Sequence, residues 1–124
     1  MEPLFWVRAG GLFMLLDVAL GAFGAHGLKD VLSSEMKQVY ETGARYQAYH
    51  ALALFVVAWL ASQYPGRCVD AAGWCFVGGI LIFSGSLYAL SLSGARWLGA
   101  ITPIGGLLFM VGWLCVMLAA RRPV

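Results

Sequence analysis

The side chains best suited to chemistry in this sequence stand close together, in residues 44–55. Arg45, Tyr46, Tyr49 and His50 occupy the first turns of a segment that then becomes apolar. A guanidinium can bind an anion, whereas phenol and imidazole groups exchange hydrogen bonds. Polar groups on an apolar helix need partners within the protein, because hydrocarbon offers none. The stretch therefore predicts a polar cluster inside a membrane protein.

A further ionisable residue, Asp17, lies in the middle of an earlier apolar run. A carboxylate near the centre of a bilayer costs about 2.5–3.5 kcal/mol on insertion scales. We expect Arg45 to pair with it, with His50 and His26 behind. Asp17 then either relays protons or contacts a polar ligand, or it simply clamps the first two membrane helices together. If the pair forms, Asp17→Asn and Arg45→Gln have less than additive effects on stability.

Three later residues complete the candidate polar cluster. Ser84 and Tyr88 are four residues apart and share one face of a helix. Thr102 precedes Pro103 near the start of the last apolar run. Serines in membrane helices usually bond to their own or a neighbouring helix, so packing is the simpler role for Ser84. The candidate set is Asp17, His26, Arg45, Tyr46, Tyr49, His50, Ser84, Tyr88 and Thr102.

Metal and catalytic chemistry are poorly supported by the sequence. Asp17, His26 and His50 have the ligand types of a zinc, iron or copper site. They stand on different helices, however, and Arg45 beside them would repel a cation. No nucleophile–base arrangement, phosphate-binding glycine loop or acidic pair is present. We therefore expect neither a metal nor another cofactor, and a non-enzymatic protein.

The elements that must position these residues are membrane helices. The 124 residues are 61% hydrophobic and 11% charged, which is too apolar for a soluble domain of this size. Four apolar runs, at 9–26, 46–64, 71–92 and 98–120, approach the ~20 residues that cross a bilayer. We predict an all-α, integral membrane four-helix bundle that forms a single domain over 1–124.

Residues 27–45 form the one substantial segment outside the apolar runs. Ser33 or Ser34 can cap a helix, and apolar residues then recur at helical spacing. We predict an interfacial amphipathic helix between spans 1 and 2 that continues into the second span, with Lys37 and Glu41 on its solvated side. Pro103 predicts a kink or a late helix start near Thr102.

The predicted orientation in the membrane depends on how the arginine and lysine residues are divided between its two sides. Four spans place both termini on one side, and arginine and lysine are equally numerous on the two sides. Discounting Arg45 as membrane-embedded favours cytoplasmic termini. Tryptophans form an expected interfacial belt on the terminal side: Trp6, Trp59, Trp74 and Trp113. The candidate polar residues fall toward the other side, with Asp17 as the floor of their site.

Several motifs resemble one uncharacterised family. They are the segments at 21–27, 46–54, 83–88 and 101–106, and their order and spacing fit over nearly the whole chain. The family comprises small four-span bacterial membrane proteins, with eukaryotic transmembrane protein 256 as a relative. The resemblance implies a multi-pass protein of the inner membrane. It implies no reaction.

Two functions remain open on the sequence. The favoured one is a binding or assembly module whose one-sided intramembrane pocket holds a lipid, a quinone-like ligand or a partner helix. The alternative is an oligomeric ion or proton-coupled channel or transporter that uses Asp17, His26 and His50. Small-residue faces make a homo-oligomer plausible in both cases. The net charge of +2 is scattered, so no nucleic-acid partner is expected.

Overall fold

The computed structural model describes residues 1–120, and this part of the chain is helical throughout, with only short connections. A π-helical turn joins α3 to α4 without a break, so that the two form one rod. A short 3₁₀ helix leads into α5. The elements are α1 (Pro3–His26), α2 (Ser34–Gln63), α3 (Arg67–Gly79), the π turn (Ile80–Ser84), α4 (Gly85–Ser93), the 3₁₀ helix (Arg96–Ala100) and α5 (Thr102–Ala119).

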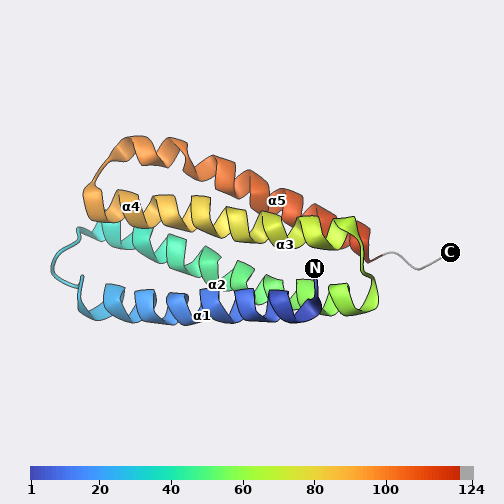
Figure 1. The fold of residues 1–124 in the computed structure, drawn as a ribbon. Helices are drawn as coiled ribbons and strands as arrows, with labels where there is room; N and C mark the ends of the chain where they lie inside the picture. Colours follow the sequence, from blue (N-terminus) through green and yellow to red (C-terminus); the bar gives the residue numbers. More distant parts are fainter. Residues whose placement is uncertain (121–124) are drawn as a thin grey trace.

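The four rods run antiparallel, one after the other, as Figure 1 shows. α1 packs mainly on α2, and α5 packs mainly on α3 and the π turn. α2 also contacts α3 and α4, so α2 and the α3–α4 rod lie between α1 and α5. The N-terminus and the end of α5 lie at one end of the bundle, and the 27–33 loop lies at the other. The predicted four-helix membrane bundle is confirmed.

Three of the rods described are long and apolar enough to cross a membrane: Pro3–His26, Arg67–Ser93 and Arg96–Ala119. The central helix α2 is less apolar, because charges occupy its first half and Gln47 and His50 its middle. Both of these side chains are buried by the neighbouring helices. A polar residue is tolerable on a helix that other helices shield from lipid.

The starts of α2 and α5 agree with the sequence signals. The hydroxyl of Ser33 accepts a hydrogen bond from the Met36 amide at 3.2 Å, which caps α2. From Ser34 the helix runs unbroken into the second apolar run, so the expected amphipathic segment is the first part of α2. The α-helix α5 begins only at Thr102, with Pro103 in its first turn, where proline is tolerated.

At four of the close approaches between rods, an aromatic ring lies on a glycine. A Cβ atom at any of these glycines would overlap the facing ring, so close packing here requires glycine. Trp6 is fully buried by such a contact and its Nε1 has no partner in residues 1–120, which differs from the interfacial position predicted for it. The pairs are Gly24 with Tyr40, Gly73 with Trp6, Gly79 with Phe109, and Gly112 with Phe76.

The interior is divided along its length into an apolar half and a polar half. At the terminal end the core is apolar and includes Trp6, Leu60, Val69 and Phe76. The buried polar residues lie nearer the loop end or at mid-length: Gln47, His50, Ser84, Ser86 and Ser91. Arg121 and Arg122, which entered the charge comparison, lie outside the described residues. The division agrees with a polar site that is closed toward the termini.

Candidate functional site

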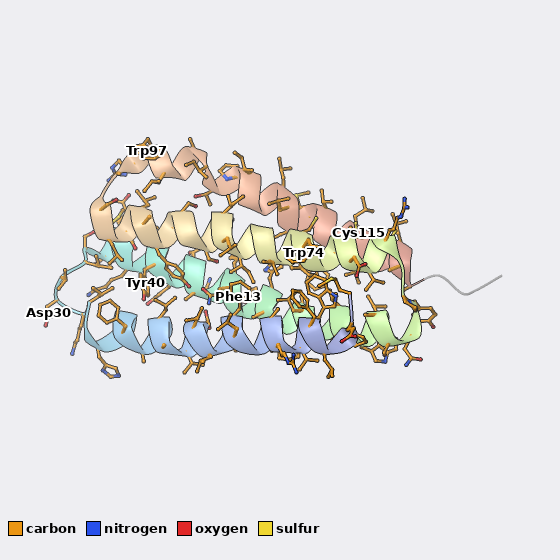
Figure 2. All side chains as sticks on the ribbon, viewed as in Figure 1. Phe13, Asp30, Tyr40, Trp74, Trp97 and Cys115 are labelled. Atoms are coloured by element: carbon orange, nitrogen blue, oxygen red, sulfur yellow. The ribbon has the colours of Figure 1, made fainter. Side chains whose placement is uncertain are left out.

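A hydrogen-bonded network joins α1, α2 and α4 in the polar half of the interior. Gln47 donates its Nε2–H to the carbonyl of Phe13 at 2.8 Å, and its Oε1 accepts from the Tyr88 hydroxyl at 2.7 Å. Tyr40 donates to the carbonyl of Leu20 at 2.5 Å, and its ring lies 5.1 Å from that of Tyr88. Figure 2 shows Phe13 and Tyr40 between α1 and α2.

Gln47 and Tyr40 are central to this network, although sequence analysis did not select them. Both are 3% exposed. A signal was available, because a glutamine that begins an apolar run must be satisfied internally. Tyr40 and Gln47 are also seven residues apart, which places them on one face of the helix.

Asp17 lies beside this network without joining it. Its Oδ1 is shielded from solvent and has no hydrogen-bond partner within residues 1–120. Its carboxyl is within electrostatic range of the hydroxyls of Tyr40 and Tyr88. Both phenols already donate elsewhere, so neither offers Asp17 a proton. Asp17 is therefore a carboxyl group beside the network that the network does not satisfy.

The predicted ion pair between Asp17 and Arg45 does not form. Arg45 is exposed, and the ion pairs of the described chain involve other residues. The reason is the helical repeat. Gln47 faces α1, and Arg45 lies two residues earlier, about 200° around the helix, since each residue turns it by roughly 100°. Arg45 therefore points away from α1.

His50 organises a second cluster on an adjacent face of α2, because a residue three positions after Gln47 lies about 60° around the helix from it. Its Nδ1 lies 2.7 Å from the carbonyl of Tyr46, and its Nε2 accepts from the indole of Trp113 at 3.0 Å. A carbonyl only accepts, so the proton of the neutral imidazole is on Nδ1. The ring stacks on Phe109 with centroids 3.6 Å apart and planes 8° apart. Since Trp113 reaches His50, it lies at mid-length, not in the predicted interfacial belt.

A groove of about 590 Å³ opens beside this cluster, between α2 and α5. The rings of Tyr46, His50 and Phe109 are nearly parallel, with planes 8–14° apart. The hydroxyls of Tyr46 and Tyr49 make no hydrogen bond within the described residues. The lining consists of Tyr46, Tyr49, His50, Phe83, Gly106, Phe109, Met110 and Trp113.

Of the remaining candidates, Ser84 and Thr102 form hydrogen bonds between helices, and His26 is exposed. Ser84 is fully buried and donates to the carbonyl of Gly43 at 2.7 Å. The hydroxyl of Thr102 lies 2.6 Å from that of Ser86 and ties α5 to α4. His26 is exposed at the end of α1. No group of three metal-ligating side chains occurs in residues 1–120, so Asp17, His26 and His50 are not brought together.

Comparison with known proteins places the chain among bacterial membrane proteins. The family described as "Protein of unknown function (DUF423)" matches residues 20–106. The chain belongs to this family. The UPF0382 membrane protein YwdK of Bacillus subtilis is 50% identical over 118 residues, covering 94% of this chain and 96% of that protein. A UPF0382 membrane protein of Staphylococcus epidermidis is 49% identical over 117 residues, covering 94% and 95%.

No solved structure matches the chain. The family match and the two relatives confirm the resemblance to an uncharacterised bacterial membrane family. The family's own description assigns no activity. The relation to transmembrane protein 256 stays a prediction.

Proposed function

We propose that this protein is a binding module whose groove between α2 and α5 holds a membrane-soluble molecule with a planar, quinone-like head and an apolar tail. The observation that carries the proposal is the set of nearly parallel rings of Tyr46, His50 and Phe109 at the groove. His50 and Phe109 are each 4% exposed and stack on one another, so the partly exposed Tyr46 ring of this set is the one that offers a face to a flat ligand. The volume of about 590 Å³ falls in the range of small-molecule sites.

The available hydrogen-bond donors support the same ligand class. The hydroxyls of Tyr46 and Tyr49 are partly exposed, at 37% and 54% for the whole residues, and have no partner in the described chain. Quinone carbonyls accept hydrogen bonds and would receive them from these phenols. Both nitrogens of His50 are occupied and its ring is buried against Phe109, so His50 supports the Tyr46 side of the groove and donates no hydrogen bond to the ligand.

A channel or proton-coupled transporter is less well supported. The terminal half of the interior is apolar, with Leu60, Val69 and Phe76 at its core. Ions and protons need a continuous polar path, which this half does not offer.

Tryptophan fluorescence tests the proposal with short-chain ubiquinone-1 as the probe. Trp113 lines the groove, so quinone binding should quench its emission saturably in the detergent-solubilised protein. Trp113→Phe should remove the saturable component, whereas Trp59→Phe should retain it because Trp59 lies outside the groove lining. Gly106→Leu, which projects into the groove from a lining position, should weaken binding at least tenfold. Equal saturable quenching in Gly106→Leu would contradict the proposal.

We further propose that the protein is inserted in the cytoplasmic membrane with both termini in the cytoplasm. The exposed thiol of Cys68 at the start of α3 is a natural probe of the terminal side. A membrane-impermeant maleimide should label it in inside-out vesicles and not in right-side-out vesicles. In a Cys68→Ser background, a cysteine introduced at the exposed Asp30 in the loop should behave in the opposite way.

A homo-oligomer also belongs to this proposal. Gly11 on α1 faces open space in the single chain, so a neighbouring copy could approach there. Native mass spectrometry of the purified protein would report the number of chains and any retained lipid or quinone together. A strictly monomeric protein would contradict the self-association without affecting the groove.

A further inference from the structure

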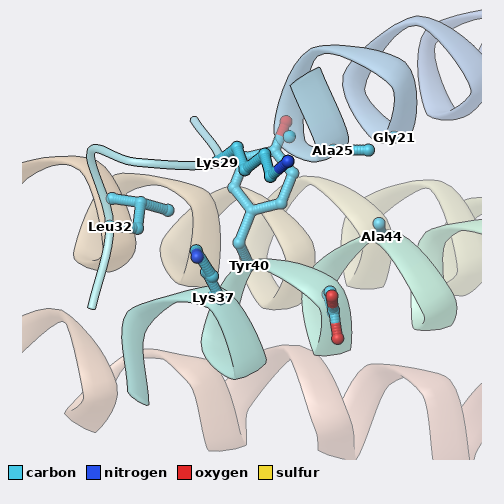
Figure 3. A pocket seen from close by; sticks show the side chains of 9 residues that line it. Gly21, Ala25, Lys29, Leu32, Lys37, Tyr40 and Ala44 are labelled. Atoms are coloured by element: carbon cyan, nitrogen blue, oxygen red, sulfur yellow. The ribbon is translucent and has the colours of Figure 1, made fainter. Parts of the chain in front are cut away.

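A hollow of about 200 Å³ lies at the loop end of the bundle, where α1 ends and α2 begins. It is separate from the groove beside His50. Lys29 from the loop and Lys37 from the first turns of α2 both line it. These are the only two lysines of the sequence. Figure 3 shows them near Tyr40, with Gly21, Ala25 and Ala44 also bordering the hollow.

The charges around the hollow leave it cationic. Neither lysine is in an ion pair within residues 1–120. Glu41 is the one acidic residue in the lining, and it also lacks an ion-pair partner in that part of the chain. The nearby Glu35 is engaged by Arg96 at 3.2 Å. Two ammonium groups therefore face one small space together with a single carboxylate.

The wall and floor of the hollow are made by small residues and a fixed ring. A Cβ atom at Gly21 would meet nothing within 4 Å, so the wall of α1 is open there. The ring of Tyr40 lies on Gly24, and its hydroxyl is held by the carbonyl of Leu20. The hollow is therefore pre-formed, with a rigid floor.

The position of the hollow matches the depth of lipid phosphates. Gly21 and Ala25 belong to the last turns of a helix long and apolar enough to span a membrane, and Lys29 follows that helix. Lysines just beyond a membrane helix lie in the headgroup layer, where anionic lipids attract them.

We propose that this hollow binds the phosphodiester group of an anionic phospholipid. Lys29 and Lys37 bind the phosphate oxygens. Gly21 and Ala25 leave room for the glycerol backbone and the first methylenes of the acyl chains. The single carboxylate of Glu41 disfavours a second negative charge on the headgroup, so phosphatidylglycerol fits better than a phosphomonoester. The proposal does not depend on the quinone-like ligand of the groove.

Native mass spectrometry of the full chain in detergent, with added phosphatidylglycerol or phosphatidylcholine, tests the proposal. The wild-type protein should retain phosphatidylglycerol in preference. The double variant Lys29→Gln with Lys37→Gln should bind it roughly tenfold more weakly or worse, because each lysine near the lipid surface contributes to the attraction. The double variant Arg8→Gln with Arg67→Gln removes two positive charges at the opposite end of the bundle and should bind like the wild type. Equal losses in the two would show a general charge effect and overturn the proposal.

Further variants and a competition with inorganic phosphate distinguish lipid binding from phosphate binding and from misfolding. Gly21→Leu fills the open wall and should weaken lipid retention at least threefold while leaving both lysines. Gly11→Leu, at an equally open position on the same helix, should not. Displacement of the lipid by inorganic phosphate at equal concentration would overturn the lipid assignment. Restoration of binding by arginine at both lysine positions supports the proposal, and failure of these folded variants to bind would overturn it.

Discussion

Trp113 of α5 donates its indole N–H to Nε2 of His50 on α2 over 3.0 Å. The two helices otherwise make few contacts with each other, because α2 packs mainly on α1 and α5 packs mainly on α3. The bond therefore fixes the width of the groove at its inner edge. It also holds the imidazole in one tautomer, since the carbonyl of Tyr46 takes the Nδ1 proton.

Breaking this bond from either side should destabilise the protein. His50→Phe keeps a ring against Phe109 but leaves the indole N–H of Trp113 without an acceptor, which costs about 1–3 kcal/mol. Trp113→Phe should cost a similar amount. The double variant should lose less than the sum, because both single changes remove one interaction. Thermal unfolding in detergent measures this, and strictly additive losses would contradict the coupling.

The Gln47 network predicts that substitution of Gln47 destabilises the protein more than substitution of Tyr88. Tyr88→Phe removes one hydroxyl and one hydrogen bond, and should cost about 0.5–1.5 kcal/mol. Gln47→Leu should cost more, since it removes two hydrogen bonds and leaves the Tyr88 hydroxyl without its acceptor in the interior. The unfolding midpoints of the two variants compare them directly. A smaller loss for Gln47→Leu than for Tyr88→Phe would contradict the network.

Alanine substitutions at the neighbouring glycines Gly105 and Gly106 of α5 should have opposite effects on stability. A Cβ atom at Gly105 would collide with the backbone of Phe83, which cannot move aside as a side chain could. Gly105→Ala should therefore destabilise by about 1–3 kcal/mol. At Gly106 the nearest atom is on the Phe83 ring, 3.9 Å away, so alanine there should be neutral or stabilise by up to about 1 kcal/mol. Similar midpoints for the two variants would contradict the packing described.

Asp17→Asn should leave the midpoint of thermal unfolding unchanged or raise it. Oδ1 has no partner to lose within residues 1–120, and an amide avoids the cost of an ionised carboxylate in a membrane interior. Arg45→Gln should have an effect within about 0.5 kcal/mol, because Arg45 is exposed. The two effects should add. A double variant that loses less than the sum would restore the ion pair expected from the sequence.

The helices could be predicted well from the sequence because the bilayer allows few alternatives. A run of about 20 apolar residues in lipid must satisfy its backbone internally, and a helix does so. The ends were less predictable. α1 begins at Pro3, six residues before the apolar run expected at 9–26, because Trp6 is buried on Gly73 of α3. A contact so distant in the sequence leaves no local signal.

The candidate site could be predicted only in part. The residues chosen near His50 do gather, because Tyr46, Tyr49 and His50 follow each other at helical spacing. Tyr88 instead bonds Gln47, and Asp17 lies beside that network. The sequence shows which residues are polar, but the side of a helix that each faces depends on which neighbour packs there. Lys29 and Lys37 were missed because their hollow forms only when the loop meets α1.

The π turn at Ile80–Ser84 sets the register of the whole third rod. A π turn carries one residue more than an α-helical turn, which rotates everything after it by roughly 100°. Ser84, the last residue of the turn, meets Gly43, and beyond the turn Tyr88 meets Gln47. Deleting one residue within the turn would swing these hydroxyls toward the lipid while leaving the composition of the segment nearly unchanged. With this one extra residue, the rod presents apolar side chains to α2 at one end. At the other end it presents hydroxyl-bearing side chains to the same helix.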